Sequence, residues 1–116
     1  MDGMFRCVTL LVCLVGALTG CTPKASQGSF DSADPAAKLY AIHRAGTDRD
    51  RAAVKDLVEQ LNSDDAAVRM MAINALDRIV GHRLGYNPYA PLVDRQAAVD
   101  RWARFARRGY ISDTEN

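Results

Sequence analysis

The chain has 116 residues, 48% of them hydrophobic, and a formal net charge of +1 at pH 7. A net charge so close to zero gives no electrostatic basis for a polyanionic partner, so we do not expect nucleic-acid binding. Three cysteines are present. Two of them, Cys7 and Cys13, lie in the first twenty residues, and the loss of that segment would leave neither a disulfide framework nor a cysteine nucleophile.

The first twenty residues have the profile of an export signal. An uncharged apolar run extends from Cys7 to Gly20, behind Arg6 and ahead of a polar stretch. A basic start, an apolar middle and small residues at the cleavage point are the three parts of a signal peptide. The run is too short for a spanning helix, which needs roughly 20 apolar residues. We therefore expect residues 1–20 to be a removable signal.

The end of this run, Leu18-Thr19-Gly20-Cys21, resembles the lipobox of bacterial lipoproteins. The resemblance implies cleavage just before Cys21 and a diacylglycerol on its thiol, with no other cofactor, so that the chain is held on a membrane of the cell envelope. A plain secretory signal that happens to contain a cysteine is the alternative. Thr22 stands where an aspartate would favour inner-membrane retention, which favours the periplasmic face of the outer membrane.

Residues 21–33 are rich in serine, glycine and proline and contain one large apolar residue, Phe30. Such a segment cannot bury enough surface to offset the entropy lost on ordering. We expect a flexible tether that, at about 5–6 Å times the square root of its length, holds the domain roughly 20 Å from the lipid. The folded domain is then residues 34–109, and residues 110–116 form a polar tail.

Caps and helical spacing predict four helices in this domain. The predicted ranges are 35–45 after the Asp34-Pro35 cap, 49–62 after Asp48, the segment from Ser63-Asp64-Asp65 to just before Gly81, and 91–108 before Gly109. Glycine ends the first helix as well, at Gly46. No stretch alternates with a period of two, so no sheet is expected.

The second and third helices together resemble a HEAT repeat. The match is carried by Leu57-Val58-Glu59-Gln60-Leu61, the turn Asn62-Ser63-Asp64-Asp65, and then Val68-Arg69, Ala72, Ala75-Leu76 and Ile79. The first helix looks like the second half of a preceding repeat and the fourth like a divergent cap, as in small HEAT-type bacterial lipoproteins. The resemblance implies an all-α fold, a short right-handed α-solenoid of about four antiparallel helices. It also implies that Arg69 bonds acids in the inter-repeat turns.

The fourth helix has two distinct faces. Ala98, Trp102 and Phe105 fall on one side at helical spacing, and a row of arginines falls on the other. We expect the apolar side to be buried, with Trp102 packed against the third helix so that it closes the solenoid.

No catalytic, metal-binding or cofactor-binding constellation is recognisable, so we expect no enzyme and no small-molecule substrate. His43 and His82 lack partners at metal-ligand spacing. The Asp64-Asp65 pair has an ordinary capping use at a helix start.

Two groups of residues are candidates for binding a partner. Arginine and tyrosine are enriched at binding hot spots, and the candidates are Arg83, Tyr86 and Tyr89 in the 81–90 loop and Arg101, Arg104 and Arg108 on the fourth helix. The alternatives are that the tyrosines cover the core and that the arginines form a solvated face.

These features predict a lipid-anchored cell-envelope protein whose helical domain is an interaction or scaffold module for another envelope protein. The alternatives are a self-associating structural protein, or binding of lipid headgroups or another polyanion by the arginine-rich helix.

Overall fold

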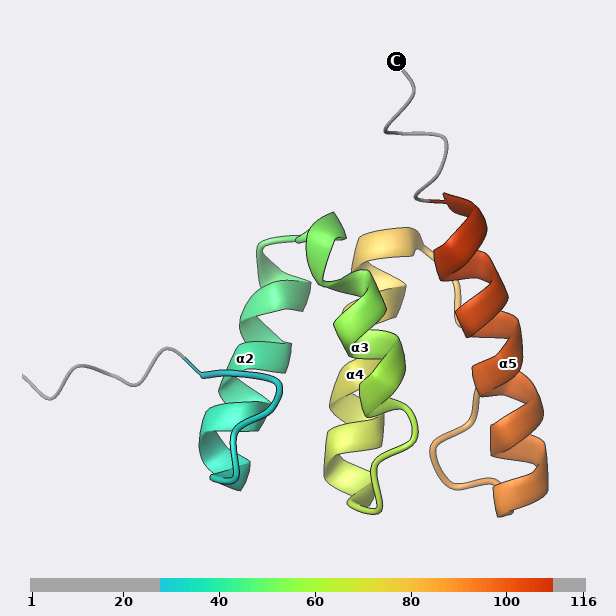
Figure 1. Cartoon of the computed structure of the whole chain (residues 1–116), viewed down its shortest axis with the longest axis horizontal. Coiled ribbons are helices and arrows are strands. Elements are labelled where there is room, and N and C mark those ends of the chain that lie inside the picture. Colours follow the sequence, from blue (N-terminus) through green and yellow to red (C-terminus); the bar gives the residue numbers. More distant parts are fainter. Residues whose placement is uncertain (1–27, 110–116) are drawn as a thin grey trace, which may run out of the picture.

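A computed structural model describes residues 28–109, which form four α-helices and one short 3-10 turn (Figure 1). The elements in chain order are α2 (Pro35–Thr47), η2 (Arg51–Ala53), α3 (Val54–Gln60), α4 (Ala66–Val80) and α5 (Leu92–Gly109). The described residues contain no strand, as the sequence predicts. The predicted signal peptide, Cys21 and the polar tail lie outside the described residues.

Aspartate side chains begin three of these elements, because each accepts a hydrogen bond from a backbone N–H that the first turn leaves unpaired. Asp34 accepts from Ala36 N–H at 3.0 Å and Asp65 accepts from Ala67 N–H at 2.8 Å, which confirms both predicted caps. The second predicted helix starts later than expected. Asp50 rather than Asp48 is its cap, because Asp48 lies at the end of α2, where its N–H donates to the carbonyl of Arg44.

The helices form a short solenoid in which α2 and α3 both pack against α4 (Figure 1). α3 runs antiparallel to α4, as the two helices of a repeat do. The loop 81–91 then returns along the molecule, so that α5 runs parallel to α4 and antiparallel to α3. α5 packs mainly on α3. The long loop is therefore needed to bring the chain back to the end at which α4 began.

Trp102 is fully buried, with 0% of its surface exposed, as the sequence predicts. Its indole N–H donates to the carbonyl of Arg83 at 2.9 Å. Its ring lies 5.5 Å from the ring of His82 and 5.6 Å from that of Phe105, measured between centroids. Trp102 also belongs to the same buried core as Ala72 and Ala75 of α4, the residues it was expected to cover.

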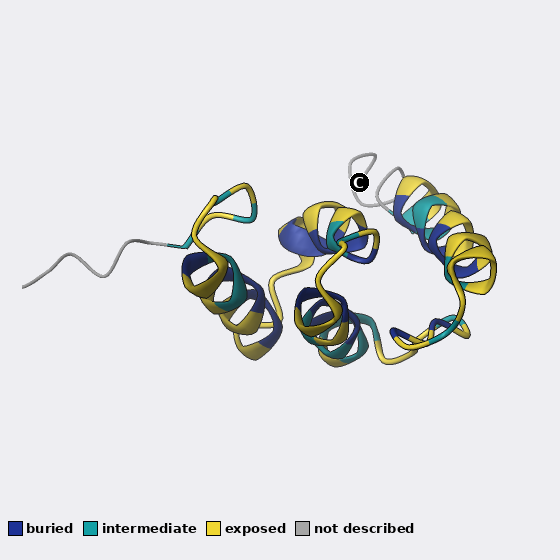
Figure 2. Ribbon diagram, turned by 90° about the horizontal axis from the view of Figure 1, so that it is seen from below, coloured by how far each residue is buried: buried dark blue, intermediate teal, exposed yellow. Residues whose placement is uncertain are grey.

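The buried residues form one core that runs through all four helices (Figure 2). Leu57 and Leu76 are fully buried where α3 meets α4, as expected from the repeat pattern. The core begins earlier than the predicted domain boundary, because Phe30 packs against it. Residues 28–33 are thus not part of a free tether, and Ser29 and Ser32 bond the backbone in the turns that lead to α2.

Gly46 lies inside α2, one residue before the helix ends, at a point where α2 lies close to Ala75 of α4. A β-carbon at this position would lie 2.8 Å from the α-carbon and 2.9 Å from the β-carbon of Ala75. Such a contact is too short for either backbone to tolerate without moving. Glycine is therefore required here for helix packing, and not only as the helix stop predicted from the sequence.

Substituting Gly46→Val should force α2 away from α4. Overpacking of this kind typically costs about 1–3 kcal/mol, a large share of the roughly 3–5 kcal/mol that so small a core supplies. Urea denaturation followed by circular dichroism measures the change. Gly81→Ala is a useful comparison, since a β-carbon there meets no atom within 4 Å but would be strained by a φ of +92°. An unchanged urea midpoint for Gly46→Val would show that the close approach is wrong.

Candidate functional site

Arg69, near the start of α4, connects the α3–α4 turn to the loop that precedes α5. It is 7% exposed, and its guanidinium donates to three backbone carbonyls: Ser63 at 2.8 Å, Asp64 at 2.9 Å and Pro88 at 3.1 Å. Arg69 does bond the turn between the helices of the repeat, Asp64 included, as expected, but through main-chain carbonyls and not through carboxylates. Its role is structural, because it ties the α3–α4 turn to the loop before α5.

Tyr86 is a second tie between the loop and the repeat, and not a binding residue. It is 4% exposed, and its hydroxyl donates to the carbonyl of Leu61 at 2.7 Å. The prediction that Tyr86 contacts a partner is therefore wrong, and the alternative that it covers the core is confirmed for this tyrosine. Burial raises the pKa of its phenol above the ordinary value of 10.0, although the nearby guanidinium groups of Arg69 and Arg95 lower it in part.

Two of the arginines predicted to bind a partner, Arg83 and Arg101, instead form hydrogen bonds that hold the 81–91 loop in place. Arg83 forms an ion pair with Asp77 at 3.2 Å and donates to the side-chain oxygen of Asn74 at 2.6 Å. Arg101 donates to the carbonyl of Leu84 at 2.9 Å. Both side chains are on the surface, but their donors serve the fold.

The remaining predicted residues, Tyr89, Arg104 and Arg108, are exposed and do lie on the surface. The structure does not bring them together. Tyr89 is in the loop, three residues before α5 begins, whereas Arg104 and Arg108 are near the C-terminal end of that helix. About 1.5 Å of rise per residue separates the two groups by roughly 20 Å.

Tyr89 belongs instead to a group of exposed apolar residues, Met70, Tyr89, Leu92 and Val93, three of which lie within five positions of the chain; we call this group the loop-end patch. The Tyr89 hydroxyl lies 3.0 Å from the Met70 sulfur. The exposed fractions of Tyr89, Leu92 and Val93 are 69%, 68% and 73%. Sequence reasoning missed the other three members of this patch. Leu92 and Val93 are apolar but lie before Ala98, where the buried stripe of α5 begins. Their position outside the stripe could have indicated that they are exposed.

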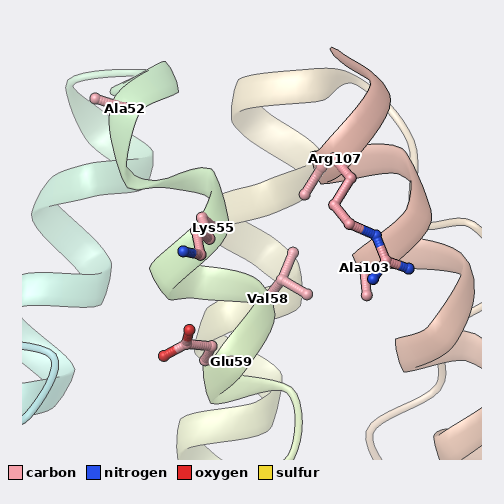
Figure 3. A pocket seen from close by; sticks show the side chains of 7 residues that line it. Ala52, Lys55, Val58, Glu59, Ala103 and Arg107 are labelled. Atoms are coloured by element: carbon pink, nitrogen blue, oxygen red, sulfur yellow. The ribbon is translucent and has the colours of Figure 1, made fainter. Parts of the chain in front are cut away.

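A groove with a volume of about 690 Å³ lies between α3 and α5 (Figure 3). We call it the α3–α5 groove. Figure 3 shows Val58 pointing from α3 toward Ala103 and Arg107 of α5. The groove exists because small side chains occupy the facing positions, and its lining residues are Ala52, Lys55, Val58, Glu59, Ala103, Ala106 and Arg107.

Within residues 28–109 no group of three or more histidine, cysteine, aspartate or glutamate side chains is placed to hold a metal ion. His82 packs edge-on against Phe105, with ring centroids 5.1 Å apart. His43 borders a small hollow of about 70 Å³ between α2 and α4. Among the described helices, none combines the length and apolar character required to cross a bilayer.

The arrangement is that of an all-helical repeat protein built from α2, α3, α4 and α5. The family model for HEAT repeats matches residues 22–108, which is most of the chain. The chain therefore belongs to the HEAT repeat family. A search of curated proteins and of solved structures returns no match.

The raised pKa of Tyr86 predicts a dependence of stability on alkaline pH. Below pH 10 the phenol is protonated in both the folded and the unfolded state. Above pH 10 the unfolded state releases its proton first, so the free energy of unfolding should fall until the pH passes the folded pKa.

Tyr86→Phe should remove this part of the pH dependence and, by leaving the Leu61 carbonyl unpaired, lower stability by about 1–3 kcal/mol at neutral pH. Urea midpoints at pH 8 and pH 10.5 measure both effects. Tyr89→Phe is the matched control, because its hydroxyl is exposed. Identical pH profiles for Tyr86→Phe and the parent protein would contradict the assignment.

Proposed function

We propose that this chain is a lipid-anchored protein of the bacterial cell envelope whose HEAT-like domain binds another envelope protein. HEAT repeats generally mediate protein–protein interaction or scaffolding, and the family match supports that part directly. The anchor is supported by the lipobox-like Leu18-Thr19-Gly20-Cys21 after an apolar run. The periplasmic face of the outer membrane is the proposed location.

The observation that carries the binding role is the loop-end patch. Three neighbouring apolar side chains expose about two-thirds or more of their surface, which costs free energy in water unless a partner covers them. Tyr89 adds a hydroxyl that can pair at the edge of an interface, as aromatic anchors commonly do. The position of Tyr89 is fixed, because the carbonyl of the preceding residue, Pro88, accepts a hydrogen bond from Arg69 of α4.

Cys21→Ala tests the anchor. Without the thiol no diacylglycerol can be attached, so metabolic labelling with palmitate should disappear and uncut precursor should accumulate. Ser26→Ala is the control, since it changes a tether residue without touching the motif. Unchanged palmitate incorporation in Cys21→Ala would contradict the lipoprotein assignment.

Replacing Leu92 and Val93 with serine tests the patch. The exposed positions should change stability by no more than about 0.5 kcal/mol each. In-cell cross-linking followed by mass spectrometry should show the loss of a cross-linked partner protein, while Tyr40→Ser, an exposed apolar residue on α2, retains it. Cross-links to another copy of the chain would favour the self-associating alternative, and retention of every cross-link would exclude the patch.

A further inference from the structure

We propose that the α3–α5 groove is the docking site of the chain's own C-terminal segment, residues 110–116. This segment follows α5 directly and reads Tyr-Ile-Ser-Asp-Thr-Glu-Asn, an adjacent apolar pair followed by two acids. The proposal depends neither on the lipid anchor nor on a partner at the loop-end patch.

The direction of the helices places the segment at the mouth of the groove. Because α5 runs antiparallel to α3, the end of α5 and the start of α3 lie at the same end of the molecule (Figure 1). Ala106 and Arg107 line the groove within the last turn of α5, two or three residues before Gly109. Tyr110 is therefore attached next to the opening.

The segment is long enough to cover the groove. Seven extended residues reach at most about 23–25 Å. The groove spans Ala52 to Glu59 on the α3 side, a rise of roughly 10 Å along a helix. A single reversal after Gly109 would bring Tyr110 and Ile111 over the groove, and the remaining residues could then cross to the start of α3.

The groove offers apolar contact to Tyr110 and Ile111. Val58 and Ala106 are lining residues with only 6% and 9% of their surfaces exposed, and Ala103 adds a third small apolar side chain. Alanine at these positions leaves room between the helices. Tyrosine buries on the order of 150–250 Å² when it is covered, and can keep its hydroxyl at the water-facing edge.

The charged residues that line the groove favour one orientation of the bound segment. Lys55 and Arg107 are the two cations among the lining residues, and Glu59, farther along α3, is the one acid. If Tyr110 and Ile111 cover Ala106 and Val58, the acids of the segment, Asp113 and Glu115, come to the start of α3 beside Lys55 and away from Glu59.

Site-specific photo-cross-linking tests this placement in the full chain. Benzoylphenylalanine introduced at Ile111 should cross-link within the same chain to α3 between Ala52 and Glu59, as mapped by mass spectrometry. The same probe at Leu92, about 25 Å away along α5, is the control and should not reach Ala52 or Lys55. Cross-links to a second copy, or to residues outside the groove, would overturn the proposal, as would the absence of any.

A charge exchange tests the direction of binding. Lys55→Glu should lower the yield of the Ile111 cross-link by about two- to fivefold, the effect of losing one exposed ion pair. Adding Asp113→Lys to that variant should restore the yield. A yield that does not fall in the first variant, or does not recover in the second, would contradict the proposed pairing.

Discussion

The guanidinium group of Arg69 fixes how the last third of the chain is placed. It is buried, and its Nε and one of its terminal nitrogens donate to three backbone carbonyls. Hydrogen bonds from a charged group contribute about 1.5–3 kcal/mol each, and removing such a group would leave these carbonyls unpaired. Two of the carbonyls belong to the α3–α4 turn and the third to Pro88, just before α5. One side chain therefore joins the repeat to the segment that follows it.

Everything beyond α4 depends on that junction. The loop 81–91 has no regular structure, so side-chain bonds hold it in place: Tyr86 to Leu61, Arg101 to Leu84, and Trp102 to Arg83. No buried side-chain polar atom in the described region is left without a partner. The loop in turn covers Trp102 and sets α5 antiparallel to α3. That orientation produces both the α3–α5 groove and the exposed start of α5.

The sequence predicts well what depends on local spacing. The caps at Asp34 and Asp65 and the repeat formed by α3 and α4 follow from short-range rules, because a capping bond or a helical stripe involves residues a few positions apart. The burial of Trp102 was also predicted, since it lies in a clear apolar stripe. HEAT family membership agrees with the motif recognised in residues 57–79.

What the sequence could not predict depends on contacts between distant residues. The direction of α5 is set by the path of the loop, and no local pattern specifies it. For the same reason the partner of Tyr86, the carbonyl of Leu61 25 positions earlier, could not be named, although burial of the tyrosines over the core was one of the two alternatives. The loop-end patch and the α3–α5 groove arise from the same tertiary arrangement, so neither could be listed from residue types alone.

The central claim, that Arg69 holds the loop and thereby α5, is tested most directly by the fluorescence of Trp102, the single tryptophan of the chain. Arg69→Lys keeps the charge, but one ammonium group cannot replace a guanidinium fork that reaches Pro88 on one side and Ser63 and Asp64 on the other. The emission of the variant should shift to the red and be quenched more strongly by acrylamide, because the loop no longer covers the indole. Blue-shifted emission as well protected as that of the parent protein would contradict the account.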